Sequence, residues 1–141
     1  GDRESPHMMP IAAVVNGARA ALVESGLPLE DIERFPVPGA YELGQAAARL
    51  AATGRFAALV CLGCLIRGET PHFDYIAQAA THGIMRASQE HLIPIAFGLL
   101  TTNTADEALA RAAAGPANKG REAALAAVAM ARLYGTIASP S

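Results

Sequence analysis

Charged and polar side chains interrupt the chain between residues 65 and 75, where the sequence reads LIRGETPHFDY. The segment follows the apolar run AALVCLG, which indicates a buried strand. Gly68 permits backbone angles at which consecutive N–H groups converge on an anion, and a helix expected to begin near His72 would add its positive end there. A histidine changes its charge near neutral pH. The pattern therefore predicts a phosphate-binding loop with His72 beside it as an acid/base group.

An interpretation without catalysis fits the same residues. Thr70 would then be a helix N-cap, Pro71 a favoured first-turn residue and His72 an ordinary surface histidine. The local chemistry leaves both interpretations open.

Two further segments carry groups suited to the same ligand. RAAAGPANKG places Arg111 and Lys119 on either side of a Gly-Pro break, as a phosphate clamp would, although two solvated cations on helices explain it equally well. PGAYE places Glu42 at a strand-to-helix turn. There it would bind a polyol or a ring nitrogen, or it would only complement the helix macrodipole.

Cys61 and Cys64 form a CxxC spacing, but it falls inside an expected strand. Positions three apart in a strand point to opposite faces, and zinc would need two more ligands. Both cysteines are therefore expected to be buried structural thiols. The histidines lack metal-ligand spacing, and no dinucleotide fingerprint, P-loop or nucleophile elbow is present. The sequence predicts neither a metal nor a redox cofactor.

The elements that must position these groups alternate between strand and helix. Strands are expected at residues 11–15, 31–37, 56–63 and 93–100, and helices at 17–26, 41–54, 73–91, 104–113 and 121–135. This order predicts an α/β protein with a parallel sheet and helices on both faces. Ligands bind beyond the carboxyl ends of such strands, where PGAYE, LIRGETPH and LLTTNT fall.

Length and composition narrow the class of protein. The 141 residues suit one domain, and 52% hydrophobic content with 17% charged residues favours burial of further surface between copies. A net charge of −2 gives no excess of basic residues for binding nucleic acid or an acidic membrane. No apolar run approaches the length of about 20 residues that a membrane-spanning helix needs. We expect a cytoplasmic protein without a signal peptide. Residues 1–8, GDRESPHM, are interpreted as a vector remnant and residues 9–141 as one domain.

Four blocks of the sequence, VPGAYEL, LGCLIRGETPHFDY, PIAFGLLTTNT and NKGREAALAAVAMA, resemble the lumazine synthase family in order and spacing. The similarity covers about residues 17 to 134. It implies condensation of 5-amino-6-(D-ribitylamino)uracil with 3,4-dihydroxy-2-butanone 4-phosphate to 6,7-dimethyl-8-ribityllumazine, phosphate and water, without a cofactor. The implied fold is a flavodoxin-like three-layer α/β/α sandwich with a four-stranded parallel sheet. The implied assembly is a pentamer, or a 60-subunit shell of pentamers, with active sites between subunits.

The resemblance also implies roles for individual positions. His72 matches the family's acid/base histidine. The other matching positions line the substrate pocket: Ala40, Tyr41 and Glu42 around the ribityl chain with Lys119 nearby, Leu65 and Ile66 on the pyrimidine, Gly68, Glu69 and Thr70 on the phosphate, and Phe97 and Arg111 from the adjacent subunit.

Three positions depart from the family's pattern. Gly115 stands where a lysine is common, and Gly44 replaces a proline. After the strand expected to end at Val15, the chain lacks the family's Arg-Phe-Asn-like stretch, which carries the aromatic side chain that stacks on the pyrimidine. We interpret this as a loop missing from the sequence; a true deletion is the alternative. A deletion would favour a catalytically weakened member that binds ligand or builds a shell. A generic flavodoxin-like nucleotide-binding module would leave His72 unexplained.

Overall fold

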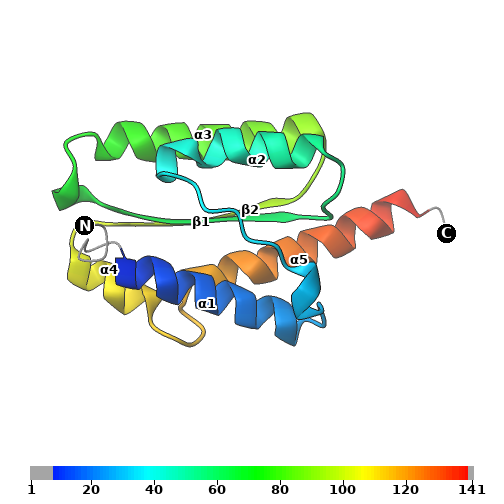
Figure 1. Ribbon diagram of the computed structural model, residues 1–141, viewed down its shortest axis with the longest axis horizontal. Coiled ribbons are helices and arrows are strands. Elements are labelled where there is room, and N and C mark those ends of the chain that lie inside the picture. The colour runs from blue at the N-terminus through cyan, green and yellow to red at the C-terminus, as the bar shows by residue number, and fades with distance from the viewer. Residues whose placement is uncertain (1–7, 140–141) are drawn as a thin grey trace.

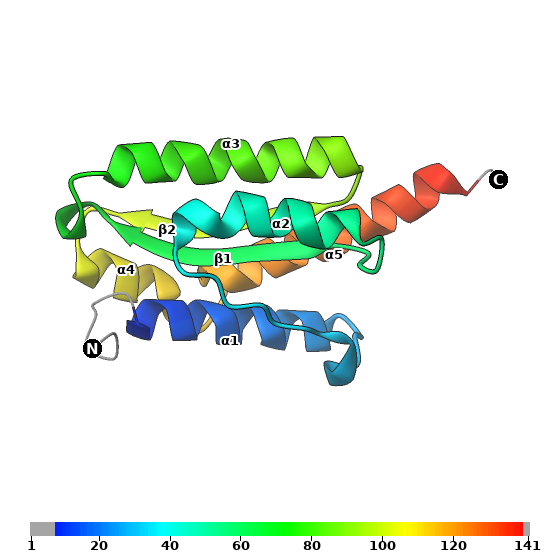
Figure 2. The same cartoon turned by 45° about the horizontal axis from the view of Figure 1, so that its top comes forward.

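The computed structural model describes residues 8–139 and has three layers (Figure 1). Helices α2 and α3 cover one face of a parallel sheet, and α1, α4 and α5 cover the other (Figures 1 and 2). The helices are α1 (Met8–Glu24), α2 (Leu43–Ala52), α3 (Phe73–His91), α4 (Ala105–Ala112) and α5 (Lys119–Ala138). The strands are β1 (Leu59–Ile66) and β2 (Ile95–Thr102), and 3₁₀ turns lie at η2 (Leu29–Asp31), η3 (Ala40–Glu42) and η4 (Arg67–Glu69). The expected α/β class with a parallel sheet is confirmed.

The two strands pair in parallel along their whole length, from Leu59 opposite Ile95 to Ile66 opposite Thr102. Alternate residues of each strand point into the two helix layers, so both strands are apolar on both faces. The strands begin and end two or three residues later than expected. Their carboxyl ends meet at one edge, where η4 follows β1 and residues 103–104 follow β2.

Two of the four expected strands are absent from the part of the chain that the structure describes, so the predicted four-stranded sheet is wrong in its count. Residues 11–15 belong to helix α1. Val14, Ala18 and Ala21 are buried at helical spacing and pack against the sheet or α5, and Pro10 lies in the first turn, where a proline is tolerated. This packing outweighs the β-propensity of a short β-branched run.

Residues 11–15 lie in helix α1, which runs without a break through Val15 and on to Glu24. The loop missing from the sequence after Val15 stays a prediction. The sequence of α1 contains no aromatic residue. The stacking side chain expected from the resemblance therefore has no counterpart in this helix.

The other missing strand was expected at residues 31–37. Asp31 ends η2, and residues 32–37 form an extended connection toward η3 (Figure 2). Within residues 8–139 it makes no strand pairing. Pro36 and Pro38 remove two successive N–H donors from the same side of the segment, so a ladder cannot form along that side. Side chains hold it instead: the Phe35 and Phe56 rings lie edge to face at 6.0 Å, and Arg55 pairs with Glu33 at 2.9 Å.

The remaining helices follow the sequence-based predictions. Helix α3 has the expected bounds, and α4 begins after Thr104, whose hydroxyl accepts a hydrogen bond from the Glu107 N–H at 3.2 Å. Gly26 and Gly54 follow α1 and α2 with positive φ, as helix-ending glycines do. The vector remnant was predicted at residues 1–8. Residues 1–7 lie outside the part of the chain that the structure describes, and Met8 is the first residue of α1.

Asn118 ties together the three helices of one layer. Its side chain is 1% exposed and donates to the carbonyl oxygens of Ala13 in α1 (3.2 Å) and Ala112 in α4 (2.8 Å). Its Oδ1 accepts from the Arg121 N–H at 3.0 Å and so caps α5. Because α4 ends with Arg111 and Ala112 and α5 begins with Lys119, Asn118 also sets the relative position of the two predicted cations.

Candidate active site

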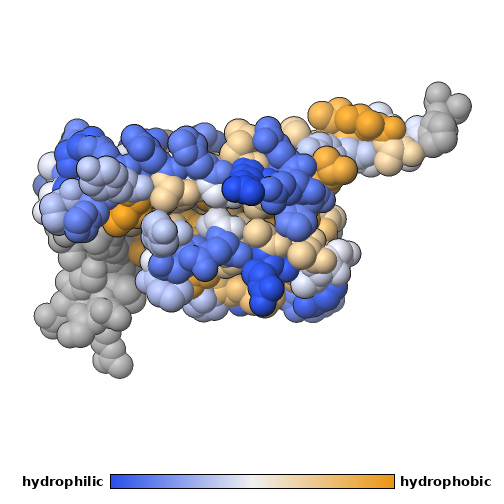
Figure 3. Space-filling model, turned by 90° about the horizontal axis from the view of Figure 1, so that it is seen from above, coloured by the Kyte–Doolittle hydropathy of each residue, from blue (hydrophilic) through white to orange (hydrophobic). Residues whose placement is uncertain are grey.

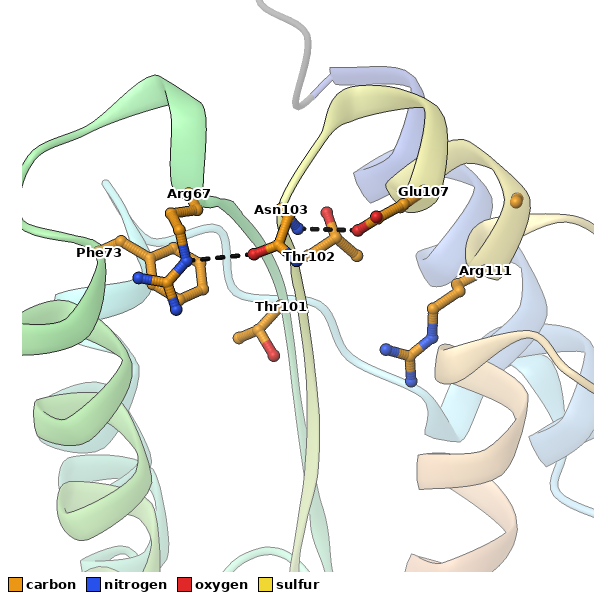
Figure 4. Close-up of a pocket in the computed structure, with 8 residues that line it drawn as sticks. Arg67, Phe73, Thr101, Thr102, Asn103, Glu107 and Arg111 are labelled. Atoms are coloured by element: carbon orange, nitrogen blue, oxygen red, sulfur yellow. Dashed lines mark hydrogen bonds between the residues drawn. The ribbon is translucent and has the colours of Figure 1, made fainter.

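A cleft of about 490 Å³ opens at the carboxyl edge of the sheet, between the start of α3 and helix α4 (Figure 4). Its floor is the end of β2. The lining residues are Arg67, Phe73, Thr101, Thr102, Asn103, Glu107, Ala110 and Arg111. Ligands of parallel α/β sheets bind at this edge, as the sequence predicted.

Arg67 forms one wall of the cleft. Its Nε donates to Asn103 Oδ1 at 3.1 Å, and its Nη1 donates to Asp74 Oδ2 at 3.3 Å. The guanidinium lies over the Phe73 ring, 4.5 Å from the ring centroid. One side chain thus touches the start of α3 and the turn after β2.

Arg111 forms the opposite wall, from the last turn of α4, and its guanidinium points into the cleft (Figure 4). Within residues 8–139, no carboxylate lies within 4.0 Å of it. The nearby carboxylate of Glu107 is engaged elsewhere, since its Oε2 accepts from the Asn103 N–H at 2.9 Å. Arg111 therefore has no salt bridge among the described residues, although Glu107 contributes a carboxylate to the same cleft.

The predicted phosphate loop lies next to the cleft. Gly68 is exposed in turn η4, and a Cβ built on it would lie 3.8 Å from the Asn103 carbonyl oxygen. The Thr70 hydroxyl accepts from the His72 N–H at 3.1 Å, and His72 rather than Thr70 occupies the N-cap position of α3. Glu69 ends the same turn. The loop thus places its backbone and the first turn of α3 side by side.

The His72 side chain is exposed, with its ring centroid 6.5 Å from that of Tyr75. It lies outside the cleft lining, although its helix supplies Phe73 to that lining. His72 therefore directly precedes a lining residue in the chain, and its imidazole is exposed.

The segment predicted to receive a polyol forms η3, immediately before α2. Tyr41 is 57% exposed, Ala40 is partly buried against the core, and Glu42 is half-buried with Oε1 close to Gly39. Helix α3 and strand β1 both contact this turn, and α3 also contacts η4 of the phosphate loop.

Leu65 and Ile66 differ from the other predicted positions because their side chains are buried at the end of β1. Leu65 packs under α2 and α3, whereas Ile66 packs on the opposite face with Val14 and Leu100. Their side chains fill the two halves of the core. A ligand at the strand end would therefore meet their backbone groups.

Phe97 and Lys119 lie apart from the cleft lining. Lys119 Nζ is 5.8 Å from the Phe97 ring centroid and 3.6 Å from Glu122 Oε1. Phe97 is 36% exposed on β2, and the Lys119 side chain is 17% exposed. In a single chain, the predicted site residues therefore divide between the carboxyl edge of the sheet and this second location.

The cleft contains groups that the sequence analysis missed. Arg67 lay within the highlighted motif, and Thr101 and Asn103 lay within LLTTNT, one of the three segments placed at the strand ends. Arg67 follows the last residue of β1 directly. Its position at the end of a predicted strand was the signal that could have identified Arg67 as a site residue. Its contact with Asn103, 36 residues further along the chain, could not be predicted, because it depends on how the two strands pair.

The cysteines match their prediction. Cys61 and Cys64 are buried, unbridged and located in different core clusters on opposite faces of the sheet. Burial raises the pKa of Cys61 to about 12 and that of Cys64 to about 11. Among residues 8–139, no three His, Cys, Asp or Glu side chains are grouped closely enough to hold a metal ion. None of the helices there has the length and apolar character needed to span a membrane.

The fold and the cleft define a parallel α/β protein whose sheet edge carries two arginines, a glutamate, an amide and hydroxyl groups. The sequence profile of 6,7-dimethyl-8-ribityllumazine synthase matches residues 8–135. Named relatives from Deinococcus radiodurans and Salinibacter ruber are each 47% identical over 120 residues, which cover 85% of this chain and 77% of the relative. One from Chlorobium phaeovibrioides is 47% identical over 121 residues, covering 86% and 78%. The chain belongs to the 6,7-dimethyl-8-ribityllumazine synthase family.

Proposed function

We propose that this lumazine synthase chain works through the carboxyl-edge cleft and the adjoining loop. As a member of the family, the chain is a transferase of riboflavin biosynthesis that condenses 5-amino-6-(D-ribitylamino)uracil with 3,4-dihydroxy-2-butanone 4-phosphate. The observation that carries the location is the Gly68 loop at the carboxyl edge of the sheet, beside the cleft. The comparisons give no support to the alternative of a catalytically weakened assembly protein.

The proposed roles follow from the chemistry. Joining two substrates requires that the reacting groups be held together, which a preformed pocket supplies as an entropic advantage. Release of phosphate requires stabilisation of an anion, for which the N–H groups of Gly68 to Thr70, the start of α3 and Arg111 of a neighbouring copy are suited. His72 is the proton carrier of the site, because an imidazole can give and take protons near neutral pH.

The other substrate lies, in this proposal, on the α2 side of the loop. Tyr41 and Glu42 offer a hydroxyl and a carboxylate to the ribityl chain, and the end of β1 at Leu65 and Ile66 offers backbone groups to the pyrimidine. Ala40 keeps this turn against the core.

We also propose that neighbouring copies complete the site, as a pentamer or a 60-subunit shell. Phe97 and Lys119, which the resemblance assigns to a substrate pocket, lie outside the cleft of their own chain. Apolar side chains are exposed along α5, whose last turns extend beyond the sheet (Figures 1 and 3): Leu125, Met130, Leu133, Tyr134 and Ile137. Association would bury them. A monomer in sedimentation velocity at micromolar concentration would contradict this. We place the protein in the cytoplasm, where free thiols persist.

The enzymatic proposal is tested by mixing the two substrates and following the absorbance of the lumazine product. His72→Ala should slow turnover with a modest loss of substrate binding, whereas Arg111→Ala should mainly raise the KM for the phosphate substrate. Arg86→Ala is the matched control, because Arg86 is an exposed arginine that pairs with Glu90 near the C-terminal end of α3, whereas the loop precedes the N-terminal end. No product above the uncatalysed background would refute the activity, and the reverse pattern of kcat and KM would refute the roles.

A further inference from the structure

The amide of Asn118 joins the ends of the two helices that carry predicted cations of the site. Asn118 directly precedes Lys119, the first residue of α5. Its Nδ2 donates at 2.8 Å to the carbonyl oxygen of Ala112, which directly follows Arg111 and ends α4. The same Nδ2 donates to the Ala13 carbonyl oxygen of α1 at 3.2 Å. One buried side chain therefore sets where Arg111 and Lys119 lie relative to each other and to α1.

The loop between the two helices, residues 113–117, offers no comparable attachment. All of its residues are exposed, and none has a polar side chain. Its backbone hydrogen bonds are local, and within residues 8–139 they reach only Ala110 and Asn118. The loop by itself therefore cannot fix the distance between the end of α4 and the start of α5, whereas the Asn118 amide links them directly.

Helix α1 has room for the Asn118 side chain at one point. A Cβ built on Gly17 would collide with the Asn118 amide, so a glycine is needed opposite it. A Cβ on Gly120 would meet the Val14 carbonyl oxygen, so the start of α5 lies directly against α1. Asn118 is 1% exposed, and a buried amide is costly unless its hydrogen bonds are made. The amide is thus confined to one position in the layer formed by α1, α4 and α5 (Figure 1).

The Lys119 side chain is grouped with a residue of the neighbouring site. Its Nζ lies 5.8 Å from the ring centroid of Phe97, and its side chain is 17% exposed. The resemblance assigns Phe97 and Arg111 to the site of the adjacent subunit. The contact with Phe97 therefore puts Lys119 in the same contributed group, so that one chain would present both cations to its neighbour.

We propose that Asn118 is a positioning residue for the reaction, which holds Arg111 and Lys119 at the spacing that the site of the neighbouring copy requires. This inference rests on the proposed function, in that it takes the site as an interface between copies. Arg111 then meets the phosphate of one substrate, and Lys119 meets the ribityl chain of the other. A displacement of about 1 Å is enough to weaken such contacts. Asn118 therefore acts on both substrates although it touches neither.

Steady-state kinetics with each substrate varied in turn tests the role. Asn118→Ser keeps a residue type favoured at an N-cap, but its short hydroxyl group does not reach the Ala112 carbonyl oxygen. The KM values for both substrates should rise, by about tenfold, with a smaller fall in kcat. A purely structural role would reduce the amount of folded enzyme, which lowers the maximal rate and leaves both KM values unchanged. An unchanged KM for either substrate would overturn the inference.

Gly17→Ala provides a second route that leaves Asn118 in place and displaces its amide. It should raise the same two KM values, and it decides the matter if Asn118→Ser does not fold. Gly135→Ala, in open space on α5, and Asn16→Ser, at an exposed position of α1, are the matched controls and should behave as wild type. Wild-type KM values in folded Gly17→Ala would refute the positioning role. Thermal unfolding of each variant establishes that it is folded.

Mixed assemblies test whether Asn118 serves the site of the neighbour. His72→Ala and Asn118→Ser chains with different affinity tags are co-expressed, and the mixed oligomers are purified through both tags. In a head-to-tail ring mixed at random, about one interface in four joins an intact His72 to an intact Asn118 from the next chain. These assemblies should regain sites with wild-type KM values. Mixed assemblies with only the raised KM values of Asn118→Ser would overturn the inference.

Binding of inorganic phosphate, measured by calorimetry, separates this inference from the proposed activity. Wild type should bind phosphate about tenfold more tightly than Asn118→Ser, with Asn16→Ser unchanged. If wild type made no lumazine but kept this difference, the activity would be refuted and the role of Asn118 upheld. Equal phosphate affinity in wild type and Asn118→Ser would refute the role of Asn118 even if the enzyme were active.

Discussion

Replacement of Asn118 by alanine should strongly destabilise the protein, although the change removes only a few atoms. The side chain is 1% exposed and satisfies two backbone carbonyl oxygens, those of Ala13 and Ala112, while it caps α5. The Ala112 carbonyl ends α4, and leaving it without a donor costs at least about 1 kcal/mol. The hydrogen bond to Ala13, whose carbonyl keeps its partner within α1, and the N-cap of α5 contribute about 1 kcal/mol each. The expected loss in the free energy of unfolding is therefore about 3 kcal/mol.

Urea unfolding at one fixed protein concentration measures this loss, because association would otherwise shift the midpoint. For a chain of this length, about 3 kcal/mol also corresponds to a fall of about 10 °C in Tm. Asn16→Ala is the matched control: Asn16 is an exposed residue within α1, and its replacement should change stability by no more than about 0.5 kcal/mol.

Asn118→Asp distinguishes the tether from the cap. Aspartate keeps the oxygen that caps α5 but cannot donate to the two carbonyl groups when it is ionised. We expect this variant to be at least as unstable as Asn118→Ala at pH 7 and to recover as the pH falls toward 4, because a carboxylate buried beside carbonyl oxygens has a raised pKa. Wild-type stability of Asn118→Asp at pH 7 would refute the reasoning and leave the cap as the main contribution.

Two further predictions concern the core. Gly120→Ala should lower the urea midpoint, because the new Cβ would meet the Val14 carbonyl oxygen. Gly135 lies in open space on the same helix, so Gly135→Ala should raise stability by up to about 1 kcal/mol. Equal effects of the two substitutions would contradict the close approach of α1 and α5. Cys61 and Cys64, with pKa values raised by burial from an ordinary 9.0 to about 12 and about 11, should resist a thiol reagent at pH 8 until the protein unfolds. Stability should fall as the pH rises above about 9, since the unfolded thiols lose their protons first, and Cys61→Ala should make that fall shallower. Rapid labelling of the native protein would contradict the burial.

Local signals were enough for helices α2 to α5 and for the C-terminal end of α1. Gly26 and Gly54 after α1 and α2, and Thr104 before α4, mark positions where the backbone itself needs a particular residue. The motif around Gly68 and His72 was also visible, since it brings polar groups to the end of an apolar run. These features depend on neighbours within a few residues, which a sequence displays directly.

The strand predictions at residues 11–15 and 31–37 failed for a common reason. A strand exists only if another strand pairs with it, and propensity does not say whether a partner is present. Val14 lies in helix α1, which packs on β1. Pro36 and Pro38 leave their segment without backbone N–H donors on one side.

The order of amino acids was thus enough to predict the helix ends, the polar loop and the enzyme family, because these depend on residues close together in the chain. The meeting of Arg67 with Asn103, the orientation of Arg111 across the cleft and the tether at Asn118 needed the folded chain. Arg67 and Asn103 are 36 residues apart, and Asn118 reaches Ala13 over 105 residues. Contacts of that span are set by the register of β1 on β2 and the packing of α1, α4 and α5, which no local pattern encodes.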